Sequence, residues 1–159
     1  MPLKIDLEFT LNGRQVGAAV PPAMSALTML REIFDLTGAK LACGEGECGA
    51  CTVLVDGKSV NACLLFAVDC AGRELVTIEG LQGEAGLDPV QQAFVDTGAV
   101  QCGYCTPGMI LQTKFLLAEN PSPSDQEIRR GLEGNVCRCT GYAKIIDAVA
   151  AAGKEQAHG

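Results

Sequence analysis

The sequence predicts an α+β fold in two parts, a small sheet with one helix followed by an all-helical four-helix bundle. Along the first half, apolar and polar residues alternate, which is typical of half-buried strands. Beyond residue 87 the apolar spacing becomes helical, after a short polar segment punctuated by glycine and proline. A chain of 159 residues is long enough for two small domains. We therefore expect a boundary near residues 80–87 and two domains, 1–80 and 81–159.

The first half should begin with a hairpin and a helix. From Leu3 to Leu11 every second residue is apolar, and Asn12-Gly13 is a typical hairpin turn. The return strand runs over residues 16–20 and ends at two prolines. Ser25 can then cap a helix. The apolar residues that would share one face of this helix are Leu27, Leu30, Ile33 and Phe34.

The remaining elements follow from the same signals. A second hairpin is expected over residues 52–60, with Asp56-Gly57 at its turn, and a further strand over 75–81. Helical spacing predicts four helices, over residues 89–97, 107–119, 124–133 and 142–152. The third of these begins with a capping box, in which Ser124 and Glu127 each satisfy a free backbone N–H.

Composition and charge exclude several classes of protein. Apolar residues make up 48% of the chain and charged residues 19%, so the chain can bury a core and is not a disordered tail. With 12 Lys and Arg against 19 Asp and Glu, the net charge of −7 opposes binding to nucleic acid. Two Tyr, five Phe and no Trp provide little surface for stacking bases. We expect no nucleic-acid partner.

Hydropathy predicts a soluble protein of the cytoplasm. The N-terminus alternates apolar and charged residues and resembles no secretory signal. Charged residues interrupt every apolar segment well before the ~20 residues that a membrane span needs. In a reducing compartment, nine cysteines are expected to serve metal or redox chemistry rather than disulfides.

Four cysteines of the first half have the spacing C-x4-C-x2-C-x11-C, which matches the plant-type pattern for a two-iron, two-sulfur (2Fe-2S) cluster. They are Cys43, Cys48, Cys51 and Cys63. The loop that carries the first three must bend tightly and turn its N–H groups toward the sulfurs. Gly44, Gly46 and Gly49 permit such bends.

A second set of four has the spacing C-x2-C-x31-C-x1-C and lies in the helical half: Cys102, Cys105, Cys137 and Cys139. Each pair directly precedes a predicted helix, and Pro107 falls in the first turn of one of them. Two helix N-termini would then meet at one site, where their positive dipole ends favour thiolate and sulfide charge. We expect a second redox centre there.

These residues also admit other interpretations. Four thiolates could bind structural zinc, although the first spacing is unusual for zinc. Cys102 and Cys105 could form a redox dithiol, but the βαβ context is missing. The three glycines also match a dinucleotide fingerprint, yet a hairpin rather than a helix follows. Rieske-type ligation needs two His, and the only one, His158, lies in a polar tail. The ninth cysteine, Cys70, is expected to be a small packed residue.

Four segments of the chain form a joint pattern: CGEGECGACTVLV from Cys43, QCGYCTPGMI from Gln101, NPSP from Asn120 and GNVCRCTGY from Gly134. Together they resemble the iron–sulfur subunit of the molybdenum hydroxylase (xanthine oxidase) family. The resemblance covers nearly the whole chain. It implies an N-terminal ferredoxin-like β-grasp domain with the plant-type cluster, and a C-terminal helical domain with a second 2Fe-2S cluster.

The resemblance also implies an electron-transfer role, with no catalytic residue on this chain. Partner subunits would supply the substrate site, a large one with a molybdenum–pterin cofactor and a medium one with FAD. By analogy, the cluster on Cys102, Cys105, Cys137 and Cys139 is nearest the molybdenum, and the other faces the flavin or an external acceptor. Gln101 and Cys139 would lie against the pterin. The substrate would be an N-heterocycle, an aldehyde, carbon monoxide or an aromatic acyl thioester.

Two functions of other classes remain as alternatives. A free-standing two-cluster ferredoxin-type carrier would suit the acidic surface, because carriers dock through weak, charge-steered interfaces. A zinc-stabilised interaction module would be colourless and contain no labile sulfide.

Overall fold

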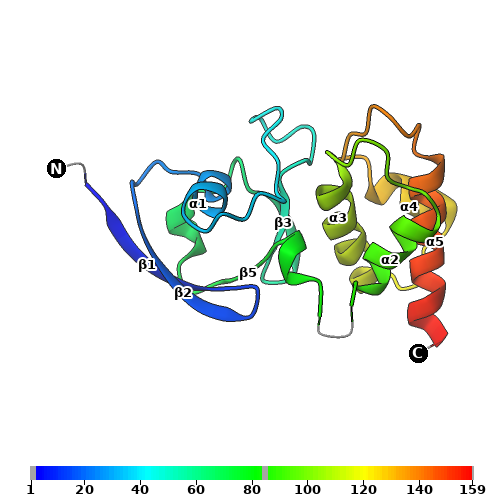
Figure 1. Cartoon of the computed structure of the whole chain (residues 1–159), viewed down its shortest axis with the longest axis horizontal. Coiled ribbons are helices and arrows are strands. Elements are labelled where there is room, and N and C mark those ends of the chain that lie inside the picture. Colours follow the sequence, from blue (N-terminus) through cyan, green and yellow to red (C-terminus); the bar gives the residue numbers. More distant parts are fainter. Residues whose placement is uncertain (1–2, 84–85, 159) are drawn as a thin grey trace.

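The computed structural model describes residues 3–83 and 86–158 and consists of two parts that lie side by side (Figure 1). One part is a twisted sheet with a short helix, and the other is a group of four helices. Each has its own hydrophobic core. The predicted α+β architecture is confirmed, although residues 84 and 85 of the expected boundary lie outside the described residues.

The sheet has five strands in the order β2-β1-β5-β3-β4. Their bounds are β1 Ile5–Leu11, β2 Arg14–Val20, β3 Thr52–Val55, β4 Lys58–Asn61 and β5 Glu74–Val76. β1 and β5 are parallel, and the other pairs are antiparallel. Both predicted hairpins are present, since Asn12-Gly13 and Asp56-Gly57 have the positive φ angles of a tight primed turn.

The core of the sheet part lies between the sheet and α1 (Ala26–Glu32). Ser25 caps α1 as expected, because its hydroxyl accepts a hydrogen bond from the N–H of Thr28. Phe9 of β1 meets Phe34 edge to face, with ring centroids 5.6 Å apart. Ile33, expected on the buried face, is exposed because the helix has ended at Glu32.

The strand predicted over 75–81 is wrong beyond Val76. The chain turns instead into a 3-10 segment, η2 (Ile78–Gly80). The side chain of Asn12, and not a neighbouring strand, makes the hydrogen bonds to Thr77. Its Oδ1 accepts from the N–H of Thr77 at 2.8 Å, and its Nδ2 donates to Oγ1 of Thr77 at 3.0 Å. A second 3-10 segment, η1 (Ala67–Cys70), precedes β5.

The helical part contains the four predicted helices. They are α2 Pro89–Asp96, α3 Thr106–Glu119, α4 Asp125–Gly131 and α5 Ala143–His158. The capping box of Ser124 and Glu127 makes both of its expected bonds. α5 continues beyond the expected end at residue 152, and the backbone of His158 is helical rather than part of a tail; the side chain of His158 lies outside the described residues.

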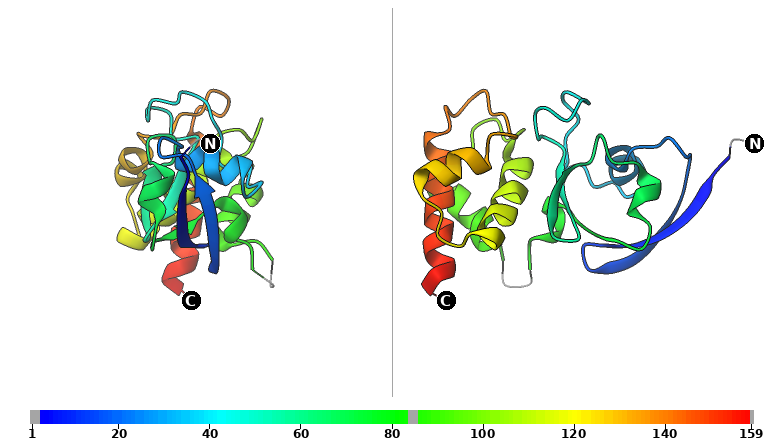
Figure 2. Two further views of the ribbon diagram at one scale, coloured as in Figure 1. Left: turned by 90° about the vertical axis from the view of Figure 1, so that its left-hand side faces the viewer. Right: turned by 180° about the vertical axis from the view of Figure 1, so that it is seen from behind.

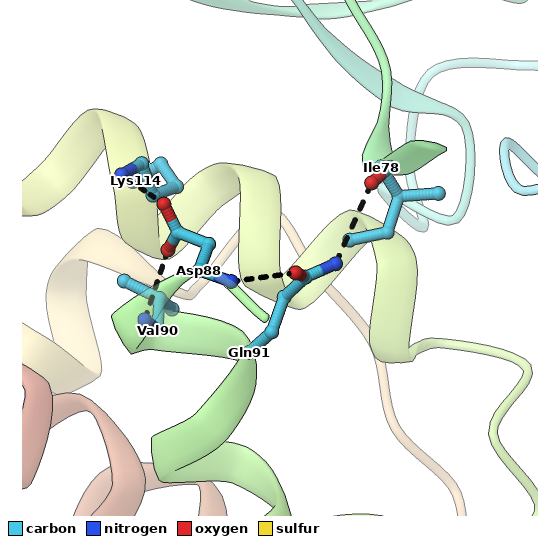
Figure 3. A network of polar contacts seen from close by, with 5 residues as sticks. All are labelled: Ile78, Asp88, Val90, Gln91 and Lys114. Atoms are coloured by element: carbon cyan, nitrogen blue, oxygen red, sulfur yellow. Dashed lines mark hydrogen bonds and ion pairs between the residues drawn. The ribbon is translucent and has the colours of Figure 1, made fainter. Parts of the chain in front are cut away.

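A polar network anchors the connection between the two parts (Figure 3). Asp88 caps α2 by accepting from the N–H of Val90 at 2.9 Å, and it also pairs with the ammonium of Lys114 on α3 at 2.8 Å. Gln91 accepts from the N–H of Asp88 and donates to the carbonyl of Ile78 in η2. The start of α2 is thereby tied both to the neighbouring helix and to the last segment of the sheet part.

The cysteine-bearing loops emerge at one edge of the molecule. Two views of the ribbon place the loop that follows α1, in cyan, and the loop before α5, in orange, on the side opposite to the C-terminus (Figures 1 and 2). Within residues 3–83 and 86–158, no helix combines the length and the apolar character needed to cross a membrane.

Candidate metal centres

The first cysteine loop bends at the three glycines that the sequence singles out. Gly44, Gly46 and Gly49 have φ angles of +70°, +79° and +66°, a region that side chains rarely tolerate. These bends turn backbone N–H groups toward the sulfur of Cys43. That sulfur accepts from the N–H of Glu45 at 3.4 Å. The expected N–H···S environment is therefore present.

The four thiols of the first set associate two by two. Cys48 influences the pKa of Cys43 through a side-chain hydrogen bond, and Cys63 influences that of Cys51 in the same way, with a further effect of Cys48 on Cys51. The pKa of the Cys43 thiol is lowered to about 6, chiefly by the backbone N–H of Glu45 and then by Cys48. Burial raises the pKa of the Cys51 thiol to about 12. The loop thus stabilises negative charge at its outer end and disfavours a free thiolate at its inner end.

The second set is held by the N-terminal ends of α3 and α5. Cys105 is the residue directly before α3, and Pro107 lies in the first turn as predicted. Cys137 and Cys139 lie a few residues before α5. These four thiols also form two pairs, Cys105 with Cys137 and Cys102 with Cys139.

Hydrogen bonds fix the segment that carries Cys137. Its N–H donates to the hydroxyl oxygen of Tyr142 at 2.9 Å, and its sulfur lies 3.2 Å from Oγ1 of Thr140. Burial acts to raise the pKa of the Cys137 thiol, but hydrogen bonds from Thr140, Cys139 and Cys105 together outweigh it and the pKa is lowered. Burial raises the pKa of Cys105 to about 12. Between Cys105 and Cys137, the thiolate form is thus more favoured at Cys137.

The donor set fits two-iron clusters. A 2Fe-2S cluster takes four cysteine thiolates, two for each iron, and each set offers two pairs of thiols. Within residues 3–83 and 86–158, no three Cys, His, Asp or Glu side chains group in the way that a single metal ion requires. When bound, such a cluster would accept and release one electron. The described residues would contribute the thiolates, the N–H donors and the shielding from water.

The second set has an outer and an inner side. Cys102 and Cys139 are exposed, as is Gln101 next to them, whereas Cys137 is buried. Gln101 is thus at the surface, as are Cys102 and Cys139, the outer pair of this set. Cys70 is fully buried in η1 within the core of the sheet part, the same core that contains Cys51, and burial raises the pKa of Cys70 to about 11. This agrees with its expected role as a packed residue.

The sequence analysis missed the residues that join the two loops. The N–H of Val136 donates to the carbonyl of Cys48 at 2.9 Å, and the side chain of Asn135 donates to the carbonyl of Gly49 at 3.0 Å. The hydroxyl of Tyr104 donates to the carbonyl of Leu41 at 2.6 Å. The only signal in the sequence for such a contact was a polar residue next to the cysteines of the motif. The residues that it contacts lie far away in the sequence and could not be predicted.

In a comparison with known proteins, each half of the chain matches the model of a 2Fe-2S domain family. Residues 9–75 match the family model "2Fe-2S iron-sulfur cluster binding domain", and residues 77–150 match "[2Fe-2S] binding domain". A protein of Bacillus subtilis (strain 168) that is named as a probable subunit of xanthine dehydrogenase is 50% identical over 143 residues, which cover 90% of this chain and 82% of the relative. The "Nicotinate dehydrogenase small FeS subunit" of Eubacterium barkeri is 47% identical over 146 residues, 92% of this chain and 93% of that protein.

The chain belongs to the family of iron–sulfur subunits of molybdenum hydroxylases. A chain in the crystal structure of quinoline 2-oxidoreductase from Pseudomonas putida 86 shares its fold with a TM-score of 0.94 at 41% identity, covering 98% of each chain. The resemblance to molybdenum hydroxylases and the ferredoxin-like fold of the iron–sulfur subunit are thereby confirmed. Because the relatives are named as subunits, the free-standing carrier is not favoured.

Proposed function

We propose that this iron–sulfur subunit carries electrons from a molybdenum–pterin site on a large partner subunit, through two 2Fe-2S clusters, to FAD on a medium subunit or to an external acceptor. The observation that carries the proposal is the occurrence of two sets of four thiols, each arranged in pairs, in a chain whose relatives are named as subunits of dehydrogenases. The chain contributes electron transfer to an oxidoreductase and no substrate chemistry of its own.

The ligand assignment follows the two sets. Cys43, Cys48, Cys51 and Cys63 would hold one cluster, and Cys102, Cys105, Cys137 and Cys139 the other. The two thiolates of each pair would share an iron. In the first cluster these are Cys43 with Cys48 and Cys51 with Cys63, and in the second Cys102 with Cys139 and Cys105 with Cys137.

The surface supports an order for the relay. Gln101, Cys102 and Cys139 are exposed together, so this side can lie against the pterin of the large subunit. Gln101 and Cys139 would be the pterin-contacting residues. We further propose residues 1–80 and 81–159 as the two domains and the cytoplasm as the location; the separate hydrophobic cores support the division.

Two single substitutions test the ligand assignment in the complete complex. Cys48→Ser should abolish the signal of the first cluster and lower the iron content from about four to about two per chain, while the second cluster remains visible by electron paramagnetic resonance (EPR). Cys105→Ser should remove the second cluster and block reduction of the first by substrate. Cys70→Ala is the matched control and should keep all the iron.

Three results would refute parts of this assignment. Two unaltered EPR signals in Cys48→Ser would refute the first ligand set. Normal turnover in Cys105→Ser would refute the position of the second cluster next to the molybdenum. Zinc in place of iron, with no labile sulfide in the purified complex, would refute the function. Purification of the native chain without larger partner chains would instead support a free-standing carrier.

A further inference from the structure

We infer that Asn135 is a positioning residue that clamps the two cysteine loops together and so keeps one main-chain hydrogen bond, from Val136 to Cys48, as the bridge for electrons between the clusters. The inference rests on the proposed function, because it takes Cys48 and Cys137 as cluster ligands. It assigns a role to a residue that binds no cluster.

Asn135 is almost fully buried, with 5% of its surface exposed, where the helical part meets the sheet part. Its Nδ2 donates to the carbonyl oxygen of Gly49 at 3.0 Å and to Oγ1 of Thr52 at 3.2 Å. The hydroxyl of Thr52 in turn donates to the same carbonyl of Gly49 at 2.7 Å. One side chain of the helical part therefore completes a closed network on the first cysteine loop. Removal of this amide would take one buried hydrogen bond from Gly49 and one from Thr52, and would leave only the bonds within the sheet part, which lowers stability.

Two glycines let the loops approach this closely. A Cβ atom on Gly49 would overlap the carbonyl oxygen of Gly134 and the amide of Asn135. A Cβ on Gly108, in the first turns of α3, would overlap the carbonyl oxygen of Gly49. Backbone thus lies directly against backbone at this point, and any added side-chain atom must push the two parts of the molecule away from each other.

The close approach places a short bonded route between the two ligand sets. Val136 directly precedes Cys137, and its N–H donates to the carbonyl of Cys48 at 2.9 Å. From the sulfur of Cys48 to that of Cys137, the route crosses this one hydrogen bond and otherwise only covalent bonds. One electron passes at a time, so that one cluster is oxidised as the other is reduced, and no proton or bond to carbon is involved.

A second contact between the two parts offers a competing route. The hydroxyl of Tyr104, between Cys102 and Cys105, donates to the carbonyl of Leu41, two residues before Cys43. This route runs through a whole tyrosine side chain and through more residues of main chain, and Tyr104 is exposed. We therefore expect the Val136–Cys48 bond to dominate.

The test uses the full chain loaded with both clusters and two readouts other than turnover. The first is the spin–spin splitting of the EPR signals when both clusters are reduced, and the second is the rate of electron exchange between the clusters after rapid one-electron reduction. Asn135→Ala should keep the iron content and both separate signals but decrease the splitting and slow the exchange. Gly108→Ala should have the same effect while the carboxamide of Asn135 is kept, because its methyl group would overlap the carbonyl oxygen of Gly49 and push the two loops apart.

Matched controls separate the clamp from a general disturbance. Asn61→Ala removes an amide that donates to the carbonyl of Gly46 in the same loop, at 2.8 Å, from within the sheet part. Gly134→Ala adds a methyl group in open space next to Asn135. Both should leave the splitting and the exchange rate as in the unaltered chain.

Unchanged splitting and exchange in both Asn135→Ala and Gly108→Ala would overturn the inference. A loss of coupling in Tyr104→Phe alone would assign the bridge to the other contact and overturn it as well. An unaltered chain that lacks two 2Fe-2S signals would instead refute the proposed function, so the two failures are distinguishable. Should Asn135→Ala fail to fold, Gly108→Ala still decides the question.

Discussion

At the scale of single residues, the first cysteine loop makes one thiol unusually acidic. The backbone N–H of Glu45 is the main cause that lowers the pKa of Cys43 to about 6. In the chain without iron, the thiolate of Cys43 should therefore be present above about pH 6 and be lost below it. Buried Cys70 has its pKa raised to about 11 and should stay a thiol throughout this range.

We predict that iodoacetamide alkylates Cys43 in the iron-free chain with a half-maximal rate near pH 6, and leaves Cys70 unmodified until the protein unfolds. Peptide mass spectrometry across a pH series measures both. Cys43→Ser is the control that removes the acidic site. Modification of Cys43 that rises only at about pH 8.5, as for an ordinary thiol, would contradict the role of the loop N–H groups.

Residues with a strong local signature were predictable from the sequence, and those that act across the fold were not. Cysteine spacing and glycine-rich bends are local, so the sequence analysis predicted both sets of candidate ligands and the tight bends at Gly44, Gly46 and Gly49. Asn135 donates to residues 86 and 83 positions away in the sequence. Nothing local distinguishes such an asparagine from an ordinary loop residue.

At the scale of elements, the start of α2 depends on a partly buried ion pair. Asp88 caps the helix and also holds Lys114 of α3, and their side chains are only 12% and 27% exposed. We predict that Asp88→Ala lowers the free energy of unfolding by about 2–3 kcal/mol, because it removes an N-cap and leaves a lysine without its partner. Chemical denaturation of the iron-loaded chain measures this change.

An exposed pair supplies the control for that experiment. Arg129 and Asp125 also lie 2.8 Å apart, but their side chains are 61% and 64% exposed. Arg129→Ala should therefore lower the free energy of unfolding by less than about 0.5 kcal/mol. Equal losses in Asp88→Ala and Arg129→Ala would show that neither the cap nor the burial matters.

Most elements were predictable because their periodicity and caps agree. The exceptions have side-chain or tertiary causes. The expected strand at 75–81 ends at Val76 because the side chain of Asn12 captures Thr77. α1 ends before Ile33, so the apolar pattern continues for longer than the helix.

At the scale of the whole molecule, two hydrophobic cores share no buried residue. Phe9 is central to the first and Phe94 to the second, and each is about 1% exposed. Substitution of either phenylalanine by alanine should lower the free energy of unfolding of its own part by about 3–5 kcal/mol. The two parts meet where α3 lies against β3 and where Ile78 packs against the second core, but each core keeps its own set of buried residues, which favours separate units of unfolding.

We predict that Phe9→Ala increases hydrogen exchange in β1, β3 and β5 but leaves the amides of α3 and α5 protected, and that Phe94→Ala does the reverse. Hydrogen–deuterium exchange with mass spectrometry on the full chain distinguishes the two patterns. Loss of protection over both parts in either variant would mean that the molecule unfolds as a single unit.

The contact of Gly49 with Gly108 and Asn135 also bears on how such proteins can be recombined. A chimaera that joins the sheet half of one relative to the helical half of another would have to keep a glycine on each face and the carboxamide between them. Donor sequences are thus best chosen by these three positions, whereas the outer strands and the far ends of the helices can vary freely.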